Sequence, residues 1–376
     1  MQNILTVSDG YSELDEYYVK SGAKTILLVC DGALQFLQLN DYFNTLEARK
    51  GIRVVKFRDF EPNPRYESVV AGIEMYQAAR CEMITAVGGG SAIDVAKCIK
   101  LFCYMNDKEN YLKQEIKPNT IPLLAIPTTA GTGSEATRYA VIYYNGEKQS
   151  ITHESCIPET VLFDASVLKT LSIYQKKATM MDAFCHAIES FWSVNSTDES
   201  KEYSKKAIRL IIENMDGYLA NTEDGNRNML KAANNAGKAI NITQTTAGHA
   251  MCYKLTSLYG IAHGHAAALC VSELFPYMID HIEDCIDNRG TAYLESVFSD
   301  FAKAMGCDNV ADAAELFRSI VDRLDLGVPK LKSEQDIDIL KNSVNPVRLK
   351  NHPVILSKDV IEELYTRMLK NGKYSQ

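Results

Sequence analysis

GGGSAIDVAKCIKLF, residues 88–102, decides the fold that we expect, because a short apolar strand ends at its glycines and a helical pattern begins directly after them. The buried face of this helix is marked by apolar residues at helical spacing: Ala92, Val95, Ala96 and Ile99. Ser91, followed three residues later by Asp94, resembles a capping box at the helix start. A strand, a glycine turn and a helix in this order predict one unit of a parallel α/β sheet.

The glycine turn is also suited to a ligand. Gly88, Gly89 and Gly90 let the backbone approach a bound molecule closely, and the positive end of the following helix favours an anion such as a pyrophosphate. The turn is not a GxGxxG fingerprint, so a tight strand-to-helix connection without a ligand is the alternative.

A second loop strengthens the prediction of a cofactor site. PTTAGTGSEATR, residues 127–138, follows an apolar run at 121–126 and places the hydroxyls of Thr128, Thr129 and Thr132 around two glycines. Hydroxyls on a flexible backbone suit phosphate and ribose oxygens.

Asp31 ends the apolar run 24–30. A carboxylate there can accept a hydrogen bond from the ribose 2′-OH of NAD and would repel the 2′-phosphate of NADP. The alternative is that Asp31 caps the turn that follows it.

The chain changes pattern near residue 165. Short β-rich runs precede that point at 24–30, 52–57, 83–87 and 121–126, separated by stretches long enough for helices. Only helical periods follow it, at 177–194, 201–219, 226–247, 291–305, 311–324 and 358–370. We therefore expect an α/β dinucleotide-binding domain with a parallel sheet over residues 1–164 and an all-helical metal-binding and substrate domain over residues 165–376.

Composition excludes several classes of partner. The 40 basic and 48 acidic residues give a net charge of −8, and no basic run offers a footprint for nucleic acid or an anionic membrane. The first residues lack a signal-peptide pattern, and no apolar run approaches the roughly 20 residues of a membrane span. Ten scattered cysteines without a CxxC pair indicate reduced core thiols. We expect a cytoplasmic protein with a small-molecule substrate.

MDAFCHAIES, residues 181–190, carries a candidate metal site. Asp182 and His186, four residues apart on a helix, share one face at about 6 Å. His249 and His263 can join them only if Gly260 breaks the helix between them, because an unbroken helix would separate the two histidines by about 21 Å. Burying a carboxylate is costly unless it is paired or binds a metal, and this donor set suits Zn²⁺ or Fe²⁺. The alternative for each residue alone is a hydrogen-bonded core histidine or a capping aspartate.

Together, GGGSAIDVAK, PTTAGTGSE, MDAFCHAIE and the spacing from His249 to His263 resemble the iron-containing, or group III, alcohol dehydrogenase family. This resemblance implies NAD(P)-dependent reduction of aldehydes or ketones, with NAD favoured here, and a homodimer. It carries a metal-ligand role to Asp182 and the three histidines. It carries cofactor roles to Asp31, Asn63 in EPNP, the glycine turn with Ser91 and Asp94, and the threonines of the second loop.

One position departs from the family pattern. Many members have a further histidine four residues after the one that matches His249, where this chain has Tyr253. Its hydroxyl could relay a proton, but we favour packing against the cofactor. His265 is then the residual candidate for a proton relay.

Three cations near these motifs point to an anionic substrate: Arg138, Lys254 and Arg348. Ordinary salt bridges are the alternative for each. Their segments are similar to the branch of the family that reduces phosphonoacetaldehyde. Rival readings are a polyol or broad-specificity alcohol dehydrogenase, a lyase of the dehydroquinate synthase type, and a catalytically silent NAD-binding assembly subunit.

Overall fold

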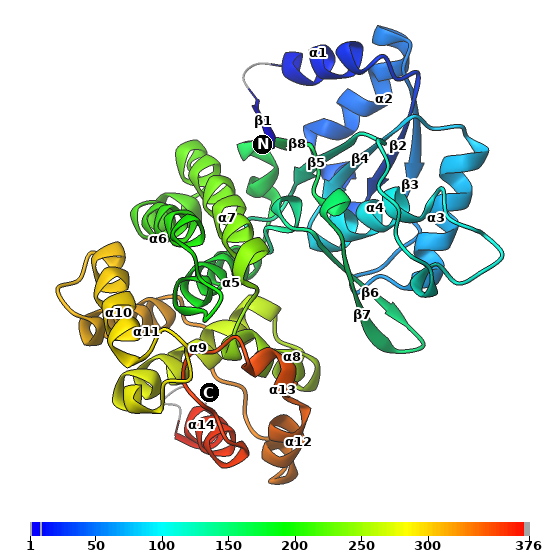
Figure 1. The fold of residues 1–376 in the computed structure, drawn as a ribbon. Helices are drawn as coiled ribbons and strands as arrows, with labels where there is room; N and C mark the ends of the chain where they lie inside the picture. The colour runs from blue at the N-terminus through cyan, green and yellow to red at the C-terminus, as the bar shows by residue number, and fades with distance from the viewer. Residues whose placement is uncertain (1, 8–9, 372–376) are drawn as a thin grey trace. The chain divides into compact units, whose positions relative to one another are not determined.

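The structure, a computed structural model, describes residues 2–7 and 10–371. The chain forms two compact units, one of Met1–Leu171 with Ala220–Leu230 and the other of Ser172–Leu219 with Lys231–Gln376. The first unit therefore extends beyond the expected boundary at residue 164 and includes a segment from the helical half. Each unit has its own architecture (Figure 1).

The first unit is built on a six-stranded parallel sheet. Its strands, in spatial order, are β1 (Asn3–Thr6), β8 (Thr160–Phe163), β5 (Leu123–Pro127), β4 (Met83–Gly88), β2 (Thr25–Cys30) and β3 (Arg53–Phe57). The four strands expected from the sequence are present, and the prediction of a parallel α/β sheet is confirmed. β1 and β8 were not expected, since each has only four residues.

The register of the central strands brings their carboxyl ends together. Cys30 of β2 pairs with Val87 of β4, and Val87 pairs with Ile126 of β5. From β2 the chain continues to β3 on one side, whereas β4 lies on the other side. In doubly wound sheets such a reversal of strand order opens the crevice in which ligands bind.

Helices accompany the strands of this unit: α1 (Ser12–Ser21), α2 (Gln38–Lys50), α3 (Tyr66–Ala78) and α4 (Gly90–Phe102). Helix α4 lies against β2, β4 and β5 and presents an apolar face to them, as its period predicted. The expected capping box is wrong. Gly89, which has no side chain, is the N-cap, and the Asp94 carboxylate instead accepts hydrogen bonds from Ser134 Oγ at 2.5 Å and Val141 N–H at 2.9 Å.

A hairpin of β6 (Tyr139–Tyr144) and β7 (Glu147–Thr152) completes the first unit. Asn145 and Gly146 both have positive φ, as a two-residue type I′ turn requires. This Asn-Gly pair was a hairpin signal that the sequence reading missed. The short 3₁₀ segments among the described residues are η1 (Gly32–Phe36), η2 (Tyr111–Lys113), η3 (Ser134–Ala136), η4 (Glu154–Cys156), η5 (Ala165–Thr170) and η6 (Ile282–Asp284).

The second unit is helical. Its helices are α5 (Ile173–Trp192), α6 (Asp198–Leu219), α7 (Glu223–Thr243, whose first residues belong to the other unit), α8 (Ala247–Tyr259), α9 (His263–Asp280), α10 (Thr291–Met305), α11 (Val310–Arg323), α12 (Gln335–Ser343), α13 (Pro346–Leu349) and α14 (Lys358–Asn371). Helix α5 is central, packing against α6 and α9, and α8 packs against α9. The expected helix 226–247 ends earlier, at Thr243, and the chain re-enters a helix at Ala247.

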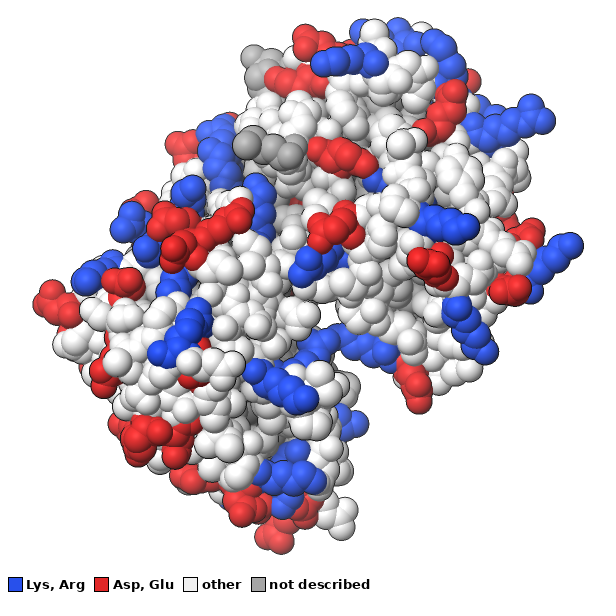
Figure 2. Space-filling view, in the orientation of Figure 1, with Lys and Arg blue, Asp and Glu red and all other residues white. Residues whose placement is uncertain are grey.

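The distribution of surface charges and the state of the cysteines agree with the expectations from composition. On the face shown in Figure 2, basic and acidic side chains lie interspersed. All ten cysteines are free thiols, buried apart from the partly exposed Cys285 and Cys307. Within the described ranges, no helix has the length and apolar character that crossing a membrane requires.

Candidate metal centre and cofactor-binding edge

Helix α5 positions the first two predicted ligands. Ser172 caps its start by accepting a hydrogen bond from Gln175 N–H at 3.2 Å, and the helix then runs unbroken through MDAFCHAIES. Asp182 and His186 are 4% and 6% exposed. The polar pair therefore faces the interior, as the four-residue spacing predicted.

A helix break brings the other two ligands close. Helix α8 carries His249 and ends at Gly260, whose φ of 72° is left-handed and whose N–H bonds Thr256 O at 2.9 Å. Helix α9 then begins at His263. The prediction that Gly260 terminates the helix is confirmed.

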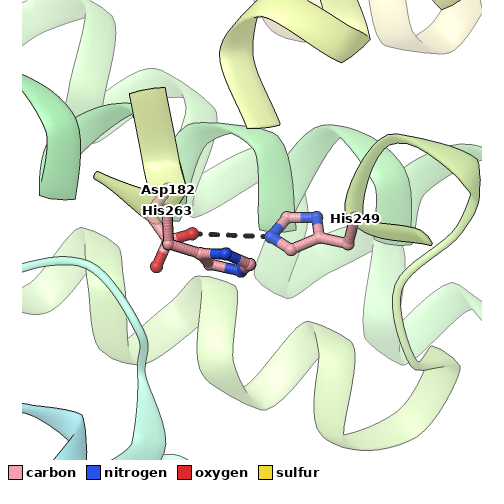
Figure 3. Close-up of side chains that lie close together, drawn as sticks. All are labelled: Asp182, His249 and His263. Atoms are coloured by element: carbon pink, nitrogen blue, oxygen red, sulfur yellow. Dashed lines mark hydrogen bonds and ion pairs between the residues drawn. The ribbon is translucent and has the colours of Figure 1, made fainter. Parts of the chain in front are cut away.

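Asp182, His249 and His263 converge (Figure 3). Their potential ligand atoms all lie within 4.8 Å of one another, and His249 Nε2 is 3.4 Å from Asp182 Oδ1. His186 lies beside this group, with its ring stacked on that of His249 at 4.4 Å between centroids. One carboxylate and two imidazoles, with a third imidazole adjacent, form a donor set that fits Zn²⁺ or Fe²⁺.

Gly264 lets α9 reach the site. A Cβ at this position would collide with the carbonyl oxygen of Ala178 and would lie 2.6 Å from Asp182 Cβ. The first turn of α9 therefore touches α5 backbone to backbone, which sets how close His263 comes to Asp182.

The electrostatics of this group favour a bound cation. Burial by itself would raise the pKa of Asp182, but the neighbouring imidazoles of His186, His249 and His263 hold it well below its usual range. Burial would lower the pKa of His249, but the carboxylates of Glu189 and Asp182 outweigh it and raise that pKa to about 9. A divalent ion can replace the proton as the positive charge that these carboxylates require.

Glu189 is a site residue that the sequence reading missed. It is fully buried on α5, and its carboxylate contacts His249 Nδ1. It also accepts hydrogen bonds from His249 N–H at 3.2 Å and from Thr246 Oγ1 at 2.8 Å. Its position three residues after His186, within the same quoted segment, was the available signal.

In the first unit, the glycine turn and the threonine loop are in contact. A Cβ on Gly89 would lie 3.3 Å from Thr129 Oγ1, and one on Gly90 would lie 3.1 Å from Thr132 Oγ1. Thr128 N–H donates to the Gly88 carbonyl at 3.0 Å. The structure thus brings together, at the carboxyl ends of β4 and β5, the two loops that we expected to hold a dinucleotide.

Asp31 and Asn63 follow the neighbouring strands. Asp31 caps η1, accepting from Ala33 N–H at 2.9 Å, so the capping alternative is confirmed for one carboxylate oxygen. Its other oxygen faces the glycine turn, 3.1 Å from where a Cβ of Gly88 would lie. Asn63 is exposed, with a φ of 59°, in the loop after β3.

Ser91 and Asp94 differ in their surroundings. Ser91 lies in the first turn of α4 and is partly exposed. The two Asp94 oxygens bond Ser134 and Val141, and Ser134 also receives Lys97 Nζ at 3.1 Å. This arrangement makes Asp94 an anchor of the threonine loop, and a direct cofactor contact for it stays a prediction.

Tyr253 lies next to the candidate metal ligands. Its ring is 5.2 Å from that of His263, and its hydroxyl accepts a hydrogen bond from Arg348 Nη1 at 2.7 Å. The guanidinium carbon of Arg348 also lies 4.9 Å from the ring centroid. Burial raises the pKa of Tyr253 beyond its usual range, and Arg348 only partly opposes this, so the phenol stays protonated.

His265 is held by two partners. Its Nε2 lies 3.0 Å from the Gly327 carbonyl, which only accepts, and its Nδ1 lies 3.1 Å from Tyr174 Oη. Tyr174 Oη also receives Ala262 N–H at 2.9 Å. Burial lowers the pKa of His265. The contacts give it a role in holding the start of α9, and its role as a proton relay stays a prediction.

The three candidate substrate cations differ in their contacts. Arg348 contacts Tyr253 beside the candidate metal ligands. Lys254 follows Tyr253 on α8 and is partly exposed. Arg138, in the first unit, forms an exposed ion pair with Glu154 at 2.7 Å. The structure therefore links only Arg348, of these three, to the candidate metal centre through a described hydrogen bond.

Two family models match consecutive parts of the chain. The one described as iron-containing alcohol dehydrogenase matches residues 2–165, and the one described as the C-terminal part of the Fe-containing alcohol dehydrogenase family matches residues 176–369. All four predicted metal ligands lie in the second match, and the glycine turn and threonine loop lie in the first.

Curated relatives include a reductase and a dehydrogenase. A phosphonoacetaldehyde reductase of Streptomyces viridochromogenes is 30% identical over 256 residues, which cover 64% of this chain and 64% of the relative. A 1,3-propanediol dehydrogenase of Citrobacter freundii is 32% identical over 323 residues, 82% of this chain and 80% of the relative.

Solved structures of similar fold match nearly the full length of the chain. A sulfoacetaldehyde reductase of Bifidobacterium kashiwanohense, solved with NAD⁺, has a TM-score of 0.85 at 25% identity and covers 98% of this chain and 96% of its own. A 1,3-propanediol oxidoreductase has a TM-score of 0.84 at 26% identity, covering 98% of both chains.

Proposed function

Since the chain belongs to the iron-containing alcohol dehydrogenase family, we propose that it is a metal-dependent, NAD-linked reductase of small aldehydes that carry an anionic group. Phosphonoacetaldehyde is the substrate that we favour. The observation that carries this proposal is the position of Arg348, hydrogen-bonded to Tyr253 beside His263.

Each cofactor has residues suited to it. Asp182, His249 and His263, with His186 beside them, would hold a divalent ion, which supplies a Lewis acid for a carbonyl oxygen. The glycine turn and the threonines would hold NADH, which supplies a hydride. Asp31 would accept the ribose 2′-OH, which favours NAD over NADP. Iron is the metal named by the family, and Zn²⁺ suits the same donors.

Arg348 has the chemistry to hold the anionic end of such a substrate. A guanidinium has five N–H donors in a planar fork, and the hydrogen bond to Tyr253 uses one of them. The remaining donors can form the paired contacts that phosphonate and sulfonate oxygens accept. Tyr253, whose hydroxyl accepts a hydrogen bond from Arg348, would orient the guanidinium group. The proton relay would then be another residue.

The names of two similar proteins support an anionic substrate. The names phosphonoacetaldehyde reductase and sulfoacetaldehyde reductase both describe a two-carbon aldehyde with a tetrahedral anionic group. The 1,3-propanediol dehydrogenase is named for an uncharged substrate. The homodimer and the cytoplasmic location expected from the sequence stay predictions.

A carbonyl panel tests the proposal. Apo protein is loaded separately with Fe²⁺ and Zn²⁺, and NADH oxidation is followed with phosphonoacetaldehyde, sulfoacetaldehyde and propionaldehyde. We expect kcat/KM to be at least about tenfold higher for an anionic aldehyde, the equivalent of one charge-assisted hydrogen bond. Equal values for propionaldehyde would reject the anionic substrate, and full activity of metal-stripped protein would reject the metal.

Arg348→Met provides the residue-level test. We expect kcat/KM for the anionic aldehyde to fall by about 10- to 100-fold, since hydrogen bonds to charged groups contribute about 1.5–3 kcal/mol. Activity on propionaldehyde should change little. Arg318→Met, which removes a cation paired with Glu273 in the same unit as Arg348, is the matched control. A loss of the same size for both aldehydes would show that Arg348 supports the fold of the site and does not recognise the anion.

A further inference from the structure

Glu189 is a fully buried carboxylate beside the candidate metal centre, and both of its oxygens have hydrogen-bond partners. It is 0% exposed and accepts from Thr246 Oγ1 and His249 N–H, while its second oxygen contacts His249 Nδ1. We propose that Glu189 is a positioning residue that fixes the tautomer and the direction of the His249 ring. This inference rests on the proposed function, because Glu189 would act through a metal ligand.

The acceptor chemistry determines where the proton lies. An ionised carboxylate only accepts hydrogen bonds. Nδ1 of His249 must therefore carry a proton and donate the hydrogen bond that Glu189 accepts. In the neutral ring, Nε2 is then unprotonated and presents its lone pair. That atom is the one 3.4 Å from Asp182 Oδ1, on the side where the candidate ligand atoms converge. A carboxylate behind a metal-bound imidazole orients the ring and increases its basicity.

Glu189 is itself held in place by a directed chain of hydrogen bonds. Trp192 Nε1–H can only donate, and it donates to Thr246 Oγ1 at 3.1 Å. The Thr246 hydroxyl hydrogen is then available for Glu189, 2.8 Å away. Trp192 is 2% exposed and Thr246 is 0% exposed, so water does not compete for these bonds.

Gly248 makes the contact between Glu189 and α8 possible. A Cβ at this position would lie 2.6 Å from Glu189 Oε1 and 2.7 Å from Val271 Cγ2. Glu189 from α5 can therefore reach the first turn of α8, where it accepts the His249 N–H. A negative charge at the start of a helix is also favoured by the helix dipole.

A purely structural role is the competing explanation. If Glu189 only caps α8, its replacement lowers stability but leaves the intrinsic affinity of the folded site for metal unchanged. If it sets the tautomer, the folded protein binds metal more weakly and loses the Nδ1–H signal of His249. The two explanations therefore differ in readouts that do not depend on enzyme activity.

The test uses Glu189→Gln in the full chain. Its carboxamide can turn an N–H toward Nδ1, which favours the tautomer with a proton on Nε2. Zn²⁺ affinity is measured by chelator competition, and the Zn²⁺-loaded protein with ¹⁵N-labelled histidine is examined for a protected Nδ1–H resonance of His249. We expect affinity to be about 10- to 100-fold weaker and the resonance to be lost.

Two further variants keep the test decisive. Thr246→Val removes the hydroxyl that holds Glu189 and should weaken Zn²⁺ binding by a smaller factor, which provides a measurement if Glu189→Gln does not fold. Asp287→Asn changes another buried carboxylate of the same unit, one that bonds Arg289, and should leave affinity unchanged.

The outcomes separate this inference from the proposed function. The role of Glu189 would be overturned if folded Glu189→Gln bound Zn²⁺ with wild-type affinity, or if it bound Zn²⁺ more weakly but kept the Nδ1–H resonance. Neither outcome would contradict the metal centre itself. A wild-type protein that binds neither Zn²⁺ nor Fe²⁺ would overturn the metal centre, and the role of Glu189 with it.

Discussion

The two carboxylate oxygens of Asp31 have different surroundings. One Asp31 oxygen caps η1 through Ala33 N–H, and the other faces the glycine turn. From the sequence, capping and cofactor recognition were alternatives for Asp31. A carboxylate has two oxygens, however, and one can cap the turn while the other binds a cofactor. The charge and the hydrogen-bonding capacity of Asp31 can therefore be tested separately.

Asp31→Asn removes the charge and keeps an oxygen that can cap η1. We expect the ratio of kcat/KM for NADH to that for NADPH to fall by at least about tenfold, because repulsion of the 2′-phosphate is lost while the turn remains, a difference of about 1.4 kcal/mol. Steady-state assays with both cofactors measure this ratio. Asp31→Ala, which also removes the cap, is the comparison. An unchanged ratio in Asp31→Asn would mean that Asp31 serves only the turn.

At the scale of the elements, local sequence patterns predicted the strands and helix ends that depend on local interactions. The central strands and the break at Gly260 followed from apolar runs and from a residue that accepts a left-handed φ. The convergence of Asp182, His249 and His263 was predicted through the family resemblance and the spacing. Glu189 and Gly264 escaped notice because their roles depend on which helix lies opposite, and no single helix period contains that information.

Close packing of α9 on α5 leads to a prediction for Gly264→Ala. The added Cβ would meet backbone of α5 at Ala178 and Cβ of Asp182, and neither is the far end of a flexible side chain. We expect the free energy of unfolding to fall by about 1–3 kcal/mol, as for other overpacked sites, and Zn²⁺ affinity to fall because His263 is displaced. Urea unfolding and chelator competition measure the two effects.

Gly327→Ala is the matched control for this helix contact. Gly327 belongs to the same unit, and a Cβ there would have no heavy atom within 4 Å. It should change neither quantity appreciably. If Gly264→Ala were as harmless as Gly327→Ala, the contact between α5 and α9 could not be what places His263.

For the molecule as a whole, the density of buried ionisable groups makes stability depend on pH. His352 is the clearest case: it is fully buried, and among the residues that the structure describes neither ring nitrogen has a hydrogen-bond partner. Burial lowers its pKa to about 4, although the charge of Glu189 acts in the opposite direction. The native state therefore keeps His352 neutral at pH values where the unfolded chain, with a pKa of about 6.5, already binds a proton.

The sign of the effect follows from this difference in protonation. Between about pH 6.5 and pH 4 the unfolded chain binds more protons at this position than the native state, so stability is lost as the pH falls through that window. The total is at most about 3.4 kcal/mol, because a difference of one pKa unit corresponds to about 1.36 kcal/mol. His352→Leu removes the titrating group and fills most of the same space. Urea unfolding of metal-free protein from pH 7.5 to 4 should show a shallower decline for the variant than for the wild type. Parallel curves would mean that His352 becomes protonated inside the folded protein, which would require water or a rearranged Glu189 beside it.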